Sequence, residues 1–333
     1  MSAVRSTRLT PPLSVDAATE AQLRDDTSLE HVQDVLRIAL DHLSSGMPGA
    51  IAVITATSGG AVRAPGAAMF VSGQGTRHGY LSGGCIDADV ALEAVRAIES
   101  GTAVHKAYGA GSGILDLPLP CGGRIDVTIT PLSDRAVIER CLAELDMRQP
   151  TRYPADFAPG KSTPAFLALP KLRIRMAGKG ADLTALAKLA VAAGHELRVQ
   201  TPDQVTSDDL SAAGIAHERL ASARSVSAPG DDAFTAFVLM FHDPDWETPL
   251  LLQALRGPAF YIGAVGSAAA QVRRLGALQR AGADDAARVR GPIGLVPSTR
   301  NASDLAISAL AEIIREFAKA TAAATVSASE VAA

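Results

Sequence analysis

The residues best suited to chemistry are a cysteine and two glycines in the stretch SGGCIDAD, where Cys85 directly follows Gly83 and Gly84. The segment after Cys85 has helical spacing. Backbone N–H groups at a helix N-terminus have no helical acceptors, so they favour a nearby anion or a thiolate. Asp87 and Asp89, in the same first turn, act against a thiolate. Cys85 is therefore a packed core thiol, a nucleophile or a ligand, and the motif alone leaves these alternatives open.

A second cysteine lies beside glycines in LPLPCGGRID, at the entrance to a predicted strand. It is Cys121, followed by Gly122 and Gly123. A third glycine-rich loop, TSGGAVRAPGAAM, carries Arg63, a candidate partner for an anionic group. The three loops could converge on one ligand, although tight turns need glycine for their backbone alone.

The stretch MAGKGADL lies between a predicted strand and a predicted helix, where the fingerprint of a dinucleotide-binding fold belongs. Gly178 and Gly180 supply its first two glycines and are candidate cofactor contacts. Leu183 stands at the third glycine position, and Thr201 stands where an acidic residue would hold a ribose. The pattern predicts a Rossmann-type turn and weighs against NAD(P).

His242 follows an apolar strand in MFHDPDWE, at the carboxyl edge where open α/β sheets bind their ligands. We consider it a candidate for ligand binding or proton transfer. The alternative is a purely structural turn in which Asp243 caps the next helix. At the same edge, YIGAVGS offers a further anion loop at Gly266 and Ser267.

The elements that must position these residues differ between the two halves of the chain. The first half has helical spacing after Leu29, an apolar run AIAVITAT, a hairpin through SGQG, and a strand RIDVTIT that alternates cleanly. In the second half KLRIRMAG, HELRVQT, AFVLMF and AFYIGAVG alternate with helical segments. We predict an α/β protein: a small α+β N-terminal domain, then a Rossmann-like, doubly wound parallel sheet.

Composition shifts set the expected boundaries, because a proline-rich stretch without periodicity separates the halves. We expect a flexible arm (1–28), an N-terminal domain (29–146), a linker (147–170), a Rossmann-like domain (171–319) and a flexible tail (320–333).

Composition also excludes several classes of function. The 333 residues carry a net charge of −4 with scattered basic residues, which argues against nucleic acid as a partner. No apolar run is long enough to span a bilayer, and the N-terminus lacks the core of a signal peptide. Three cysteines, the third being Cys141, do not form a secreted disulfide framework. We expect a cytoplasmic protein without a membrane partner.

Taken together, SGGCID, LPCGGRID, YIGAVGS and GPIGL followed by DLAISALAEI resemble the xanthine dehydrogenase accessory family, XdhC/CoxI, over roughly residues 35–315. The resemblance implies a small N-terminal domain joined to a Rossmann domain. It implies a carrier that binds the molybdenum cofactor (molybdopterin), supports its sulfuration by a cysteine desulfurase, and delivers it to a molybdenum hydroxylase such as xanthine dehydrogenase. A homodimer is also plausible from the resemblance.

The resemblance places Cys85 and Cys121 near the molybdenum or its sulfido group. Because the cofactor carries a terminal phosphate, backbone turns suit it too. The expected cofactor-binding residues are thus Cys85, Cys121, Gly83, Gly84, Gly122, Gly123, Arg63, Gly178, Gly180 and His242. The chain departs from the family pattern at Asp87, where glutamate is common, and at several polar positions of the Rossmann half. These departures fit a divergent member.

Two other functions compete with a non-catalytic carrier. An NAD(P)-dependent oxidoreductase would use the Rossmann half, against which Leu183 and Thr201 weigh. An interaction scaffold would bridge hydroxylase and desulfurase without holding the cofactor, but it would have no need for Cys-Gly-Gly turns.

Overall fold

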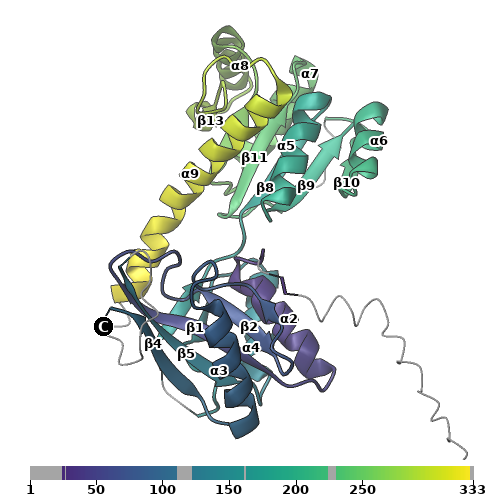
Figure 1. Ribbon diagram of the computed structural model, residues 1–333. Helices are drawn as coiled ribbons and strands as arrows, with labels where there is room; N and C mark the ends of the chain where they lie inside the picture. The colour runs from purple at the N-terminus through teal and green to yellow at the C-terminus, as the bar shows by residue number, and fades with distance from the viewer. Residues whose placement is uncertain (1–24, 27, 111–121, 161–162, 224–229, 331–333) are drawn as a thin grey trace, which may run out of the picture. The chain divides into compact units, whose positions relative to one another are not determined.

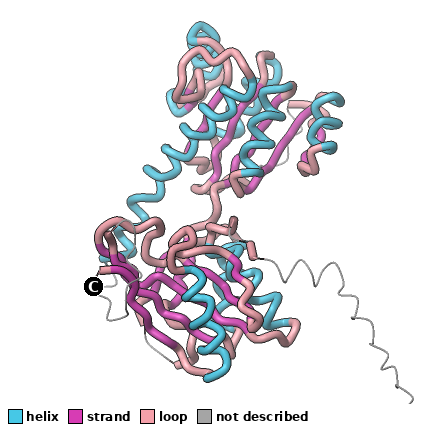
Figure 2. The backbone as a smooth tube through the Cα atoms, in the orientation of Figure 1, coloured by secondary structure: helices cyan, strands magenta, loops and turns pink. Residues whose placement is uncertain are grey.

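The structure, a computed structural model, describes residues 25–26, 28–110, 122–160, 163–223 and 230–330. The chain divides into two compact units, each with its own sheet and helices (Figures 1 and 2). Unit 1 runs up to Ala143 and takes in Arg152–Ala168, whereas unit 2 takes in Glu144–Thr151 and continues from Leu169.

Unit 1 is built on a five-stranded antiparallel sheet in the order β3-β2-β1-β5-β4. In β5 the predicted alternation holds, because Ile125, Val127 and Ile129 all lie in one hydrophobic core. The strands are β1 (Gly49–Ser58), β2 (Ala68–Ser72), β3 (Arg77–His78), β4 (Val104–Gly109) and β5 (Arg124–Pro131).

Helices cover both faces of this sheet. On one face α3 (Asp87–Ser100) buries Val90 and Ala94 in the core, and it ends at Gly101, whose φ of 65° suits glycine after a helix. On the other face lies α2 (Val32–Ser44), where the ring of His42 is 4.8 Å from that of Phe70. A third helix, α4 (Ala136–Asp146), follows β5.

Unit 2 has six parallel strands in the order β10-β9-β8-β11-β12-β13. The order reverses between β8 and β11, which is the switch point of a doubly wound sheet. The strands are β8 (Arg173–Gly178), β9 (Glu196–Thr201), β10 (His217–Arg219), β11 (Thr235–Met240), β12 (Tyr261–Ala264) and β13 (Val289–Arg290).

Two apolar layers enclose this sheet, because alternate residues of each strand face opposite sides. Ile174 and Met176 pack with α5 (Ala181–Ala192) and α9 (Ala302–Glu330), which lie on one face (Figure 1). Phe237 and Leu239 pack with the helices of the other face. These are α7 (Pro244–Leu255) and α8 (Ala268–Arg280), while α6 (Gln204–Ala212) follows β9 and η1 (Ala286–Arg288) precedes β13.

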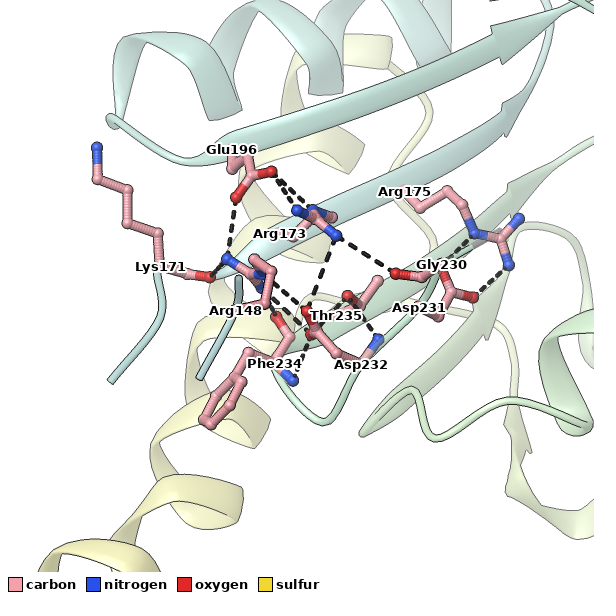
Figure 3. A network of polar contacts seen from close by, with 10 residues as sticks. All are labelled: Arg148, Lys171, Arg173, Arg175, Glu196, Gly230, Asp231, Asp232, Phe234 and Thr235. Carbon is pink, nitrogen blue, oxygen red and sulfur yellow. Dashed lines mark hydrogen bonds and ion pairs between the residues drawn. The ribbon is translucent and has the colours of Figure 1, made fainter. Parts of the chain in front are cut away.

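A network of ion pairs and hydrogen bonds lies at the amino edge of this sheet (Figure 3). Arg148 donates to Asp232 at 2.7 Å and to Glu196 at 2.9 Å, which anchors the segment Glu144–Thr151 to unit 2. Arg175 and Asp231 form a buried pair at 2.7 Å. Burial raises the pKa of Asp232, but the hydrogen bonds from Arg148 and Thr235 outweigh it and hold that pKa below its ordinary value.

The observed boundaries differ from the predicted ones at three places. The expected linker 147–170 contains two paired strands, β6 (Thr151–Pro154) and β7 (Ala165–Ala168), and its residues are divided between the units. The expected tail 320–333 continues α9 as far as Glu330. Most of the expected arm 1–28 lies outside the described residues. Of the rest, Asp25 forms an ion pair with Arg77, and the backbone of Asp26 forms a β-bridge with that of His78.

Candidate functional site

Two of the three glycine-rich loops of the first half meet at one end of the unit 1 sheet. Gly60, after β1, forms a bridge with Gly122, just before β5. A Cβ atom on Gly123 would overlap the carbonyl group of Gly60 and lie 2.9 Å from the carbonyl oxygen of Ser58. Gly123 is therefore glycine because two backbones approach closely here, a role that packing alone requires.

Arg63 joins the loop after β1 to the segment that leads into the cysteine turn. Its guanidinium group donates to the carbonyl oxygen of Glu30 at 2.6 Å and to that of Tyr80 at 3.4 Å, and it lies 4.6 Å from the centre of the Tyr80 ring. These contacts give Arg63 a structural role, and its predicted contact with a ligand stays a prediction.

The cysteine turn is organised by Asp87, the first residue of α3. One carboxylate oxygen accepts hydrogen bonds from the backbone N–H groups of Leu81 and Ser82, both at 3.0 Å, and from the Ser82 hydroxyl at 3.2 Å. The other accepts from the N–H of Gly84 at 2.8 Å. Only 3% of Asp87 is exposed, so the turn is closed around its carboxylate.

This arrangement differs from the one that the sequence predicts for the charged and N–H groups around Cys85. The sequence predicts that Asp87 opposes a thiolate and that the turn offers its amides to a ligand. In the structure the carboxylate and several of these amides, including that of Gly84, satisfy each other inside the fold. Asp89 likewise accepts a hydrogen bond from the Tyr108 hydroxyl at 2.8 Å. The Cys85 side chain remains exposed.

Gly83 and Gly84, the two residues before Cys85, have φ values of 72° and 115°, which residues with side chains rarely adopt. A Cβ atom at either position would meet nothing within 4 Å, so both Cα atoms border open space. A ligand can therefore approach the backbone closely on the exposed side of the turn. Because Tyr108 of β4 binds Asp89 of α3, this turn lies at the same end of the sheet as Gly122 and Gly123.

The other two cysteines have different places. Cys121 lies outside the described residues, so its distance from Cys85 stays open. Cys141 is buried on α4, with its sulfur 3.6 Å from the carbonyl oxygen of Arg152, in keeping with a packed thiol. Within the part of the chain that the structure describes, no group of three or more His, Cys, Asp and Glu residues could hold a metal ion.

In unit 2 the fingerprint glycines have internal roles. A Cβ atom on Gly178 would overlap the carbonyl oxygen of Met240, so glycine allows β8 and β11 to approach. The N–H of Gly180 donates to the Thr206 hydroxyl at 2.8 Å, and that hydroxyl donates to Asp203 at 2.7 Å. The amide that would lead a pyrophosphate site is thus bound by a side chain from α6.

Leu183 and Thr201, the two residues that weigh against NAD(P) binding, also have structural roles inside unit 2. Leu183 is fully buried in the core beneath α5, where burying a leucine contributes about 1.5–3 kcal/mol. Thr201 ends β9 as a buried residue whose hydroxyl accepts a hydrogen bond from the N–H of Asp203. The hydrogen bonds from Thr206 lower the pKa of Asp203, the residue that caps α6.

His242 is exposed at the carboxyl edge of unit 2, and Asp243 caps α7 as the structural alternative requires. His242 also lines two hollows, of about 990 Å³ and about 280 Å³, that share Ala270 and Arg273 on α8. Sequence reasoning missed Arg273. A usable signal was the seven-residue spacing between Arg273 and Arg280, which places two arginines on one face of a helix.

Two families match the chain. Residues 42–109 match the "XdhC and CoxI family", and residues 174–313 match the "XdhC Rossmann domain". The first match ends with β4 and includes Cys85, and the second spans the strands of unit 2 from the second residue of β8.

One curated relative and one solved structure extend this likeness. The "Molybdenum cofactor insertion chaperone PaoD" of Escherichia coli (strain K12) is 32% identical over 295 residues, which cover 84% of this chain and 86% of the relative. A crystal structure from Bacillus halodurans, described as a xanthine dehydrogenase, shares the fold with a TM-score of 0.71 and 19% identity, covering 87% of this chain and 96% of the other. None of the helices in the described residues is long and apolar enough to cross a membrane.

Proposed function

The chain belongs to the XdhC and CoxI family, and from this premise we propose that it is an accessory protein that binds the molybdenum cofactor and inserts it into a molybdenum enzyme. The relative named as a molybdenum cofactor insertion chaperone supports this role across most of both chains. The cofactor is then the cargo of the protein rather than a resident catalytic group.

The observation that carries the proposal is the exposed thiol of Cys85 on a turn that Asp87 has closed from within. Thiolate sulfur is a soft ligand, suited to a metal that is already bound by dithiolene sulfur. Because the acidic side chains of the first turn of α3 have partners inside the fold, an incoming anionic cofactor meets no unpaired carboxylate from Asp87 or Asp89.

Each residue of this end of unit 1 then has a role. Cys85, together with Cys121, contacts the metal or its sulfido group. Gly83 and Gly84 present open Cα surfaces, on which the pterin can lie close to the backbone. Gly122 and Gly123 hold the loop that follows Cys121 against Gly60.

We propose the finer features of the role from the family resemblance. The receiving enzyme would be a molybdenum hydroxylase of the xanthine dehydrogenase type. A cysteine desulfurase would supply the terminal sulfur to the cofactor while the cofactor is held. The chain would act in the cytoplasm, as a homodimer.

Anaerobic loading tests cofactor binding. The full chain is incubated with molybdenum cofactor and separated by gel filtration, after which molybdenum and oxidised pterin are quantified. We expect about one cofactor per chain, and an affinity at least about tenfold lower in Cys85→Ser and in Cys121→Ser, because each variant removes a soft ligand. Cys141→Ser is the matched control, since that thiol is buried, and its retention should equal that of the unmodified chain.

The outcomes separate the proposal from its rivals. A chain that retains no cofactor under anaerobic conditions would contradict it. Capture of both a hydroxylase and a desulfurase by a chain without pterin would favour the scaffold. Equal retention in Cys85→Ser and the unmodified chain would move the binding site away from the cysteine turn.

Delivery is tested separately by mixing the loaded chain with a cofactor-free hydroxylase of the xanthine dehydrogenase type. The hydroxylase should gain activity in proportion to the molybdenum transferred, and faster when a cysteine desulfurase and cysteine are present. Transfer without any effect of the desulfurase would remove sulfuration from the proposed role and leave cofactor insertion in place.

A further inference from the structure

Two arginines of α8 line a hollow without a partner, in contrast to the arginines at the amino edge of the unit 2 sheet. At the amino edge Arg148, Arg173 and Arg175 all form ion pairs (Figure 3). Arg273 lines both hollows and Arg280 lines the smaller one; both are exposed and have no hydrogen-bond or ion-pair partner among the described residues. A pair of unpaired cations facing a hollow favours an anionic ligand.

Arg274, the residue after Arg273, makes the contacts that fix α8 in place and leaves the Arg273 side chain unpaired. Arg274 is buried and donates to Glu247 at 3.0 Å, to the Gln271 side chain at 2.8 Å and to the carbonyl oxygen of Val265 at 2.9 Å. These bonds hold α8 against α7 and against the turn that follows β12. Glu247 is the carboxylate that lines the smaller hollow, and Arg274 neutralises it.

The larger hollow has the size and lining of a small-molecule site. Its volume of about 990 Å³ lies at the upper end of the range for ligand pockets. Its apolar wall includes Val265, Ile293 and Leu305, and its polar groups include His242, Ser267, Arg273 and Asp182. Ser267 caps α8, whose first amides add to the positive potential that Arg273 supplies.

The loop 292–299 that forms the far wall is firmly held. The N–H of Gly294 donates to Glu312, and the N–H of Val296 donates to the Ser308 hydroxyl at 2.7 Å, so two residues of α9 fix this loop. A wall fixed by buried partners provides a shaped surface before any ligand arrives, which lowers the entropic cost of binding.

We propose that this hollow binds a mononucleotide, with its phosphate on Arg273 and His242, its base against the apolar wall, and a sugar hydroxyl or base amino group donating to Asp182. A dinucleotide is not the expected ligand, because Thr206 already binds the Gly180 amide. The site goes beyond the proposed function and does not depend on it, since every residue involved belongs to unit 2.

Isothermal titration calorimetry on the full chain tests the site with AMP, GMP, CMP and UMP as probes, and with the four corresponding nucleosides. At least one mononucleotide should bind at one site per chain, and its nucleoside at least about tenfold more weakly, because charge-assisted bonds to the phosphate are lost. Inorganic phosphate should compete with the bound mononucleotide. Arg273→Ala should lower the affinity about tenfold or more, and Arg280→Ala by less.

The matched control is Arg256→Ala, which removes an exposed arginine at the C-terminal end of α7. This variant should change the affinity by less than about twofold. Because Arg273 is exposed, its variant should unfold at the same temperature as the unmodified chain. The proposal is overturned if no mononucleotide binds at millimolar concentration, if a nucleoside binds as tightly as its nucleotide, or if Arg273→Ala leaves the affinity unchanged.

Discussion

Both units place a glycine turn in front of a helix, and in both a side chain of the protein binds the turn from inside. In unit 1 the carboxylate of Asp87 accepts hydrogen bonds from three backbone N–H groups and one hydroxyl, and the thiol of Cys85 is exposed to solvent. In unit 2 the hydroxyl of Thr206 binds the single amide of Gly180. Arg273, on α8, is an exposed cation that lines the hollow at that edge.

The difference shows that a glycine turn does not by itself define a ligand. Once its amides have internal acceptors, the turn is a rigid support, and the side chain next to it sets the chemistry. A thiol suits a soft metal centre, whereas a guanidinium group suits phosphate. Two turns with similar sequences thus point to two different kinds of ligand.

The largest expected effect concerns thiol accessibility. In the chain without cofactor, iodoacetamide should alkylate Cys85 at least about 100-fold faster than Cys141, because the buried thiol reacts only when its surroundings open. Mass spectrometry of the digested protein measures each site separately. Similar rates at the two sites would show that α4 opens readily or that Cys85 is covered.

Removing the internal acceptor of unit 1 should have the next largest effect. Asp87→Ala leaves the amides of Leu81, Ser82 and Gly84 without their acceptor and should lower the unfolding free energy of unit 1 by about 3 kcal/mol. Urea unfolding, followed by circular dichroism, measures the loss. Glu99→Ala, on the exposed side of the same helix, should stay within about 0.5 kcal/mol. A small loss of unfolding free energy in Asp87→Ala would mean that the turn is stable without the contacts of this carboxylate.

The equivalent change in unit 2 should cost less. Thr206→Val deprives one amide, that of Gly180, of its acceptor, so we expect a loss of about 1–2 kcal/mol. Ser211→Ala, at an exposed position of the same helix, serves as the control. A loss as large as that of Asp87→Ala would remove the contrast between the two turns. Titration of the variant with NAD should show no binding, because Leu183 still fills the third glycine position.

The smallest effect is a pH dependence in unit 1. Burial, followed by the nearby charge of His42, lowers the pKa of His78 in β3, the strand that leads into the cysteine turn, although Asp25 and Asp26 act in the opposite direction. As the pH falls, His78 therefore binds a proton in the unfolded chain at a higher pH than in the folded chain. Stability is fully present above the ordinary histidine pKa of about 6.5 and falls as the pH drops from there through the folded pKa, by at most about 1.4 kcal/mol per pH unit.

Unfolding experiments between pH 7.5 and 5 measure this slope, and His78→Phe should reduce it because the titrating group is gone. A slope that is unchanged in the variant would assign the pH dependence to other groups.

The sequence predicts most regular elements, but not β6, β7 or the full length of α9, and it does not predict the partners of the turns. The alternation of Ile125, Val127 and Ile129 predicts β5, because alternate side chains of a strand face one core. The contact between Gly60 and Gly122 joins residues far apart in the chain, and no local pattern encodes it. For the same reason the binding of Gly180 by Thr206 was not predictable.

Two residues show which contacts local reasoning does not display. Asp87 was expected to repel a thiolate, since its distance from Cys85 in sequence is short, yet its carboxylate turns inward to the backbone of its own turn. For Gly178 the cofactor contact stays a prediction, and the structure adds that its missing side chain makes room for Met240. In both cases the deciding contact is with the backbone, which sequence patterns do not display.

The most direct test of cofactor binding at the cysteine turn is the alkylation rate of Cys85 in the chain loaded with molybdenum cofactor. Bound cofactor should slow alkylation of Cys85 by about tenfold or more relative to the chain without cofactor, while the rate at Cys141 stays the same. An unchanged rate at Cys85 in a chain that retains one cofactor would contradict binding of the cofactor by this thiol.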